Sequence, residues 1–150
     1  MSGPERFPLG SPGVAPSDVP LVTNRRLLGG DHFAAAKAAD GTVVDVRVWV
    51  ERDDLVLLVC DRDVPGTWIE PGGTPSDADV EGAGTARCAY RRTARREVAE
   101  ETGIDCSITG LRGVVRHERI CRPDPAAEAV LYQLFYRAEY DGGSLDPSPD

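Results

Sequence analysis

The feature that most constrains the fold is the segment Thr85 to Thr102, which is long, rich in charged residues and alanine, and free of glycine and proline. The absence of both helix breakers predicts a helix, and Gly103 directly after it is a typical helix stop. The segments on both sides instead alternate with a period of two or form short apolar runs, as strands do. One long helix between strands predicts a mixed α/β domain.

Five segments carry strand signals. Residues 44–50 place valine at every second position, which predicts a half-buried strand, and the charged residues 51–54 predict a hairpin turn after it. The continuous apolar run Leu55–Cys60 predicts a strand buried on both faces. A short strand from Trp68 ends in a glycine turn at 72–73, and residues 108–120 and 129–140 predict two more strands after the helix.

The charge balance and the apolar patterns narrow the partners. With 17 basic and 25 acidic residues, a net charge of −8 disfavours binding to a nucleic acid polymer. No apolar stretch approaches the roughly 18 residues that span a bilayer. The start of the sequence has no basic head followed by an apolar run, so we expect a cytoplasmic protein without a membrane partner. The four cysteines form no C-x-x-C pair and are expected to be reduced.

The basic residues are unusual because only Lys37 is a lysine. Codon bias in a GC-rich genome and adaptation of the surface to high salt both explain this composition, and the sequence leaves the two open.

The chain divides into four parts. Prolines at every fourth position predict an extended or disordered arm over residues 1–20. Residues 21–41 form a lead-in segment, with a short helix or irregular stretch at 31–40. Residues 42–140 form the domain proper. The turn-rich residues 141–150 predict a flexible tail.

Three glutamates near the end of the predicted helix carry the chemistry. Glu97, Glu100 and Glu101 stand at i, i+3 and i+4, which places three carboxylates on one face within a single turn. They repel one another and lie at the helix end where the dipole disfavours anions. Mg²⁺ or Mn²⁺, which prefer oxygen ligands, would compensate for both effects. The alternative is a solvated acidic face paired with neighbouring arginines.

The segment R-E-V-A-E-E-T-G-I, residues 96–104, resembles the second half of the Nudix box, G-x5-E-x7-R-E-U-x-E-E-x-G-U, where U is a bulky aliphatic residue. The preceding W-I-E-P-G-G, residues 68–73, resembles the strand and turn that introduce this box. The resemblance covers residues 42–140. It implies a Nudix-type α/β/α sandwich with a mixed sheet.

The chain departs from the box in two ways. Counted back from Arg96, the first glutamate of the box falls on Cys88 and its glycine on Gly82. If the glycine is instead Gly73, the box is enlarged by about nine residues and Gly82 matches by accident. The first glutamate is then missing from its expected place. Three acids of the enlarged loop could supply a replacement carboxylate, and the spacing from Arg96 does not choose among Asp77, Asp79 and Glu81.

The resemblance implies a role for each matched residue. Glu97, Glu100 and Glu101 would bind Mg²⁺ or Mn²⁺, and Glu100 or Glu101 would also serve in catalysis. Arg96 would orient the glutamates, and Gly103 would support the helix end. Around them, Gly72 and Gly73 would approach the phosphates, Trp68 would contact the substrate, and Glu118 is a candidate general base from a later strand.

Many members of the Nudix family close their sandwich with a helix after the last strand, and the sequence after residue 140 predicts none. Either the domain is minimal, or a second copy in a homodimer covers the exposed sheet, or the sequence is a fragment.

The implied function is metal-dependent hydrolysis of a diphosphate linkage in a nucleoside diphosphate derivative, such as an ADP-ribose-like compound or a nucleoside triphosphate. One alternative is a Nudix-like domain without catalysis that binds a nucleotide or a partner. A second is an unrelated α/β domain with an acidic helix.

Overall fold

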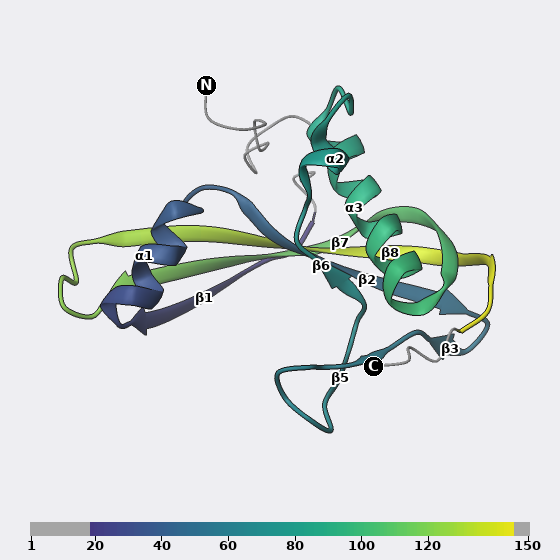
Figure 1. Ribbon diagram of the computed structural model, residues 1–150, viewed down its shortest axis with the longest axis horizontal. Helices are drawn as coiled ribbons and strands as arrows, with labels where there is room; N and C mark the ends of the chain where they lie inside the picture. The colour runs from purple at the N-terminus through teal and green to yellow at the C-terminus, as the bar shows by residue number, and fades with distance from the viewer. Residues whose placement is uncertain (1–18, 146–150) are drawn as a thin grey trace.

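The computed structural model describes residues 19–145, and the predicted N-terminal arm lies outside this range except for its last two residues. A six-stranded mixed sheet forms the centre of the molecule, with strand order β1-β7-β8-β2-β3 and β6 pairing with β2 (Figure 1). Its strands are β1 (Leu21–Leu28), β2 (Val43–Arg52), β3 (Leu55–Val56), β6 (Gly72–Gly73), β7 (Ile104–Cys121) and β8 (Glu128–Gly143). β1 lies in the segment assigned from sequence only as a lead-in.

Two long antiparallel strands, β7 and β8, run the length of the molecule. β2 is parallel to β8 and β1 is parallel to β7, so both ends of the sheet are built on this pair. The pairing of β7 with β8 is interrupted by irregularities, one of them between Leu111 and Gly113. Such bulges bend a strand and redirect a side chain, here that of Arg112.

The main core lies between the sheet and helix α3 (Ala86–Thr102). Val46, Val48 and Val50 of β2 are buried at alternate positions, as the sequence predicts. On the helix, Tyr90 and Val98 are almost fully buried against this face. Alternation along β2 and helical spacing along α3 therefore fix which face of each element meets the other.

Helix α1 (Gly30–Ala38) covers the opposite face of the sheet, near the other end of the long strands (Figure 1). Phe33 and Ala36 pack there against Ala129 of β8, whereas Leu134 of the same strand belongs to the main core. Residues 129 and 134 have opposite parity and therefore point to opposite faces of the strand. The fold is thus an α/β/α arrangement, in agreement with the sequence-based expectation.

Both ends of α3 agree with the sequence. The Thr85 hydroxyl caps the N-terminus by accepting a hydrogen bond from the Cys88 backbone N–H at 3.2 Å. Gly103 ends the helix in the left-handed conformation, with φ of 78°. A non-glycine residue there would be strained, because its Cβ clashes with the backbone at positive φ. Among the described residues, α3 is the last helix of the chain.

The expectation of one buried strand over Leu55–Cys60 is wrong. The segment divides into β3 and β4 (Val59–Cys60), and β4 pairs with β5 (Trp68–Ile69) in a separate two-stranded sheet. Leu55 and Leu58 are exposed. An apolar run cannot by itself distinguish a central strand from a segment that leaves the sheet edge to line a cleft. Within residues 19–145, no helix has the length and apolar character needed to cross a bilayer.

Candidate active site

The three glutamates occupy the last turns of α3, but their surroundings differ. The Glu97 side chain is 15% exposed, whereas that of Glu100 is 59% exposed. The Glu101 carboxylate is half-buried and lies near Glu97 and Arg47. Burial raises the pKa of Glu101, and the neighbouring charge of Glu97 raises it further. Two acidic groups therefore meet at close range beside β6.

The glycine turn at 72–73 is packed closely against its neighbours. A Cβ built on Gly73 would lie 2.4–2.6 Å from the carboxylate atoms of Glu97. A Cβ on Gly72 would lie 2.0 Å from the backbone oxygen of Val46. β6 pairs with β2 through Gly72 and Arg47, and this pairing brings the turn against the glutamates. The lack of side chains thus lets the backbone approach the acidic end of α3.

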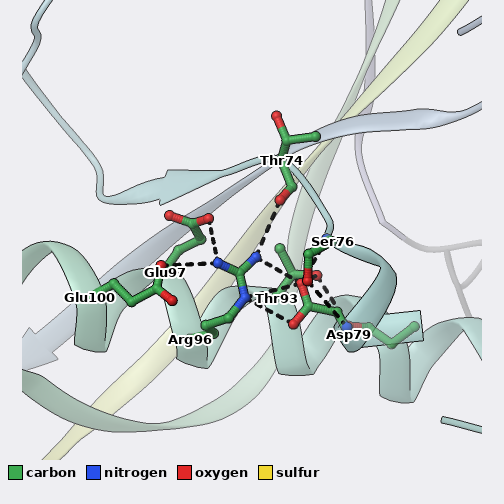
Figure 2. A network of polar contacts seen from close by, with 8 residues as sticks. Thr74, Ser76, Asp79, Thr93, Arg96, Glu97 and Glu100 are labelled. Atoms are coloured by element: carbon green, nitrogen blue, oxygen red, sulfur yellow. Dashed lines mark hydrogen bonds and ion pairs between the residues drawn. The ribbon is translucent and has the colours of Figure 1, made fainter. Parts of the chain in front are cut away.

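Arg96 holds the glutamates from one side (Figure 2). Its Nη1 donates to Glu97 Oε1 at 2.8 Å and to Glu100 Oε2 at 3.0 Å. Its Nη2 donates to Asp79 Oδ2 at 2.8 Å and to the Thr74 backbone oxygen at 3.3 Å. The pKa of Arg96 is raised, chiefly by its hydrogen bonds to Asp79. The guanidinium therefore joins the two glutamates to the loop that follows β6.

Asp79 is the buried carboxylate behind Arg96. It lies in the short helix α2 (Asp77–Val80) and accepts from Arg96 Nε and Nη2, from the Ser76 backbone N–H and from the Thr93 hydroxyl. Burial raises the pKa of Asp79, but the hydrogen bonds from Arg96, Ser76 and Thr93 outweigh it and hold the pKa at about 2. Asp79 is therefore ionised over the physiological range and fixes the guanidinium.

Asp79 resolves the choice that the sequence left open. It lies six residues after Gly73, which is the spacing G-x5-E of the family pattern counted forward from the glycine. Counting backward from Arg96 does not reveal this match, because the surplus residues lie in between. The surplus residues lie between Asp79 and Arg96, in the turn at 81–85 and the first turns of α3. Cys88 is exposed in the first turn of α3, about two turns before Arg96.

An open cleft of about 1120 Å³ lies beside this cluster. All three glutamates line it, and so does Gly72. Two arginines that the sequence did not single out, Arg47 and Arg62, also line the cleft and bring positive charge, and so does Trp68 line it, with 65% of its surface exposed. The role of Arg47 depends on the pairing of β2 with β6, which no local pattern reveals. The cleft thus places carboxylates and guanidinium groups around one space.

Two residues singled out from the sequence are not brought to this cleft. Glu118 lies on β7 opposite Arg25 of β1, with its carboxylate 4.0 Å from Arg116 Nε. Glu118 does not line the cleft. Gly73 contacts the cluster but lies behind the cleft surface, whereas Gly72 lines it.

The donor set suits a hard divalent cation. Glu97 and Glu101 offer carboxylate oxygens, which are the ligands that such cations prefer, and both line the cleft. Within residues 19–145, no three acidic, histidine or cysteine side chains are already gathered as a complete cage. Glu100, which is exposed and bonded only at its Oε2 to Arg96, is the third donor on the same helix face.

Fold and site together define an α/β protein whose long helix presents carboxylates to a cleft, against a glycine turn. The sequence model of the NUDIX domain matches residues 41–150, and the chain belongs to the Nudix family. A search of curated proteins found no match to this sequence.

Three of the solved structures that are similar to this chain are the following. A MutT protein from Bacillus halodurans aligns with a TM-score of 0.50 at 26% identity, over 70% of this chain and 61% of that protein. A UDP-X diphosphatase aligns with a TM-score of 0.49 at 18% identity, over 81% and 55% of the two chains. An ADP-ribose pyrophosphatase from Streptococcus suis aligns with a TM-score of 0.45 at 20% identity, over 71% and 66%. The chain thus spans 55–66% of the length of these structures.

Proposed function

We propose that this protein is a metal-dependent pyrophosphohydrolase that cleaves the diphosphate linkage of a nucleoside diphosphate derivative, such as an ADP-ribose-like compound or a nucleoside triphosphate. The observation that carries the proposal is the group of three glutamates at the cleft, two of which, Glu97 and Glu100, are bonded to Arg96, which Asp79 holds in turn. Two facing carboxylates repel, and a buried ion network that maintains them is costly unless a cation is bound there.

Glu97, Glu100 and Glu101 are the proposed ligands of Mg²⁺ or Mn²⁺. The cation, when bound, neutralises charge on the diphosphate and activates the attacking water. The Oε1 atom of Glu100, which is not bonded to Arg96, is the proposed acceptor of the proton from that water. Glu101, which is more buried than Glu100, is the proposed ligand that positions the cation. Glu118 lies outside the cleft and is not part of the proposal.

Arg47 and Arg62, which line the same cleft, are the proposed phosphate-binding residues. Arg47 is fixed by a hydrogen bond from its Nε to Asp45 Oδ2 at 2.8 Å and from its Nη1 to the Glu70 backbone oxygen at 3.1 Å. A preorganised guanidinium binds phosphate oxygens at lower entropic cost than a mobile one. Trp68 lies close enough to the same space to contact the rest of the substrate.

The experiment is hydrolysis of a panel containing ADP-ribose, GDP-sugars, UDP-sugars, dinucleoside polyphosphates and nucleoside triphosphates, with Mg²⁺ or Mn²⁺. Glu100→Gln and Glu101→Gln are the test variants, and Glu139→Gln, an exposed glutamate on β8, is the matched control. We expect turnover in the wild type and in Glu139→Gln, and a loss of at least a hundredfold in the two test variants. Nucleotide binding without turnover across the panel would favour the domain without catalysis.

Three further expectations concern the setting of the protein. A homodimer is proposed because the edge strand β1 exposes Leu21, Val22 and Leu27, each more than half exposed. Light scattering after gel filtration tests it, and a monomeric mass at micromolar concentration contradicts it. From composition alone, we propose a cytoplasmic protein with a salt-adapted surface. A free energy of unfolding that falls as the salt concentration rises toward 2 M contradicts the salt adaptation.

A further inference from the structure

A second cavity adjoins the cleft on the sheet face opposite α3. Its volume is about 550 Å³, which suits a nucleobase with its sugar. It shares part of its wall with the cleft, including Arg47 and Trp68. Both tryptophans of the chain, Trp49 and Trp68, line it together with Phe135. Three aromatic side chains next to a proposed phosphate site offer stacking surface for a base.

Arg112 and Glu70 form an ion pair across this face. The bulge in β7 releases Arg112 from the regular pairing, and its guanidinium lies 4.7 Å from the centroid of the Trp49 ring and 5.9 Å from that of Phe135. Arg112 Nη2 bonds Glu70 Oε1 at 2.5 Å. Contacts of this kind restrict the arginine through both the ring faces and the carboxylate. The pair therefore holds the Glu70 carboxylate at the cavity wall.

The second carboxylate oxygen of Glu70, Oε2, is buried and has no hydrogen-bond partner in the described residues. A buried acceptor without a partner costs free energy, and in native proteins such an atom calls for an explanation. Glu70 lines the cavity, so a bound molecule with N–H groups would supply the missing donor. Trp68, two residues earlier and largely exposed, has room to move and let the ligand reach this atom.

We propose that this cavity binds the base of the substrate and that Glu70 makes it selective for guanine, an inference that rests on the proposed hydrolase function. A carboxylate only accepts hydrogen bonds. Guanine presents two adjacent donors, N1–H and the N2 amino group, to such a group. Adenine and cytosine place a ring nitrogen acceptor beside their amino group, and uracil places its single N3–H between two carbonyl oxygens. In adenine, cytosine and uracil, an acceptor lone pair beside the donor would therefore face the Glu70 carboxylate and repel it.

The test is binding of GMP, AMP, CMP and UMP without added metal, measured by quenching of tryptophan fluorescence. We expect GMP to bind the wild type at least tenfold more tightly than the other three, because an unmatched polar group in such a site is strongly disfavoured. Glu70→Gln keeps the shape but presents an amide, so GMP should lose at least tenfold while AMP gains or is unchanged. Trp68→Ala, at an exposed position, should weaken all four without reordering them.

Equal affinities for the four nucleotides in the wild type, or an unchanged GMP preference in Glu70→Gln, would overturn the inference. Circular dichroism and thermal melting establish that each variant is folded, and Glu139→Gln is the control. Hydrolysis of the substrate panel is scored separately. Turnover without base preference contradicts only the guanine site, whereas GMP preference without turnover contradicts only the hydrolase.

Discussion

Arg96 of α3 and Asp79 of α2 form a bidentate ion pair, with Nε at 3.0 Å from Oδ1 and Nη2 at 2.8 Å from Oδ2. The Asp79 side chain is 5% exposed, so the pair is shielded from solvent on the side of the carboxylate. The other face of the guanidinium holds Glu97 and Glu100. Asp79 thus acts through Arg96 and positions the glutamates without lining the cleft.

Replacing Asp79 with asparagine should destabilise the protein. The substitution leaves Arg96 without its buried counter-charge and disturbs the hydrogen bonds from Ser76 and Thr93. We expect a loss of about 2–3 kcal/mol in the free energy of unfolding by urea. The matched control is Asp77→Asn, an exposed aspartate in the same helix, which should change it by less than about 0.5 kcal/mol. Equal effects of the two substitutions would show that Asp79 has no special role.

Acid should remove the contribution of Asp79 in a defined pH window. Its pKa is about 2 in the folded protein, whereas an unperturbed aspartate has a pKa of about 3.8, so the stabilisation is complete above pH 4 and disappears as the pH falls through 2. A difference of this size corresponds to about 2 kcal/mol. Urea unfolding from pH 5 to pH 2 should show this component in the wild type and lack it in Asp79→Asn. Identical pH profiles would contradict the assignment.

The two glycines of the turn should fail in different ways when each is replaced with alanine. The new Cβ of Gly72→Ala meets the backbone oxygen of Val46, so stability should fall by several kcal/mol or the protein should not fold. That of Gly73→Ala meets only the side chain of Glu97, which can move. Gly73→Ala should therefore remain folded by circular dichroism but lose at least tenfold in kcat. Gly110→Ala, where nothing lies within 4 Å, is the control.

Restoring a glutamate at position 88 should not improve the enzyme. Cys88 is exposed at the start of α3, and the carboxylate that Arg96 requires is already supplied by Asp79. Cys88→Glu should leave kcat/KM within about twofold of the wild type and should not rescue Asp79→Asn. If Cys88→Glu clearly raised kcat/KM in the wild type or in Asp79→Asn, position 88 and not Asp79 would be the place of the missing glutamate.

The helix and the placement of its three glutamates were largely predictable from the sequence because the signals are local. The caps Thr85 and Gly103 and the spacing of the three glutamates all lie within twenty residues. The alternation of valines in β2 likewise fixed the buried face of that strand.

The remaining features depend on contacts between distant segments. Arg47 reaches the cleft because β2 pairs with β6, and Arg112 reaches Glu70 because a bulge frees it. The apolar residues 55–60 resemble a core strand in composition, yet several of them border the cleft instead. Propensity and periodicity do not report such pairings, because they describe which faces are buried and not which segments meet.

The central claim is that the acidic end of α3 is a cation site, and binding of Mn²⁺ measured by electron paramagnetic resonance tests it most directly. Wild type and Glu139→Gln should bind Mn²⁺, and Mg²⁺ should compete for the same site. Glu101→Gln should weaken binding at least tenfold while leaving the metal-free protein as stable as the wild type or more so, because it removes a charge that Glu97 opposes. Equal Mn²⁺ affinity in Glu101→Gln and the wild type would contradict the claim.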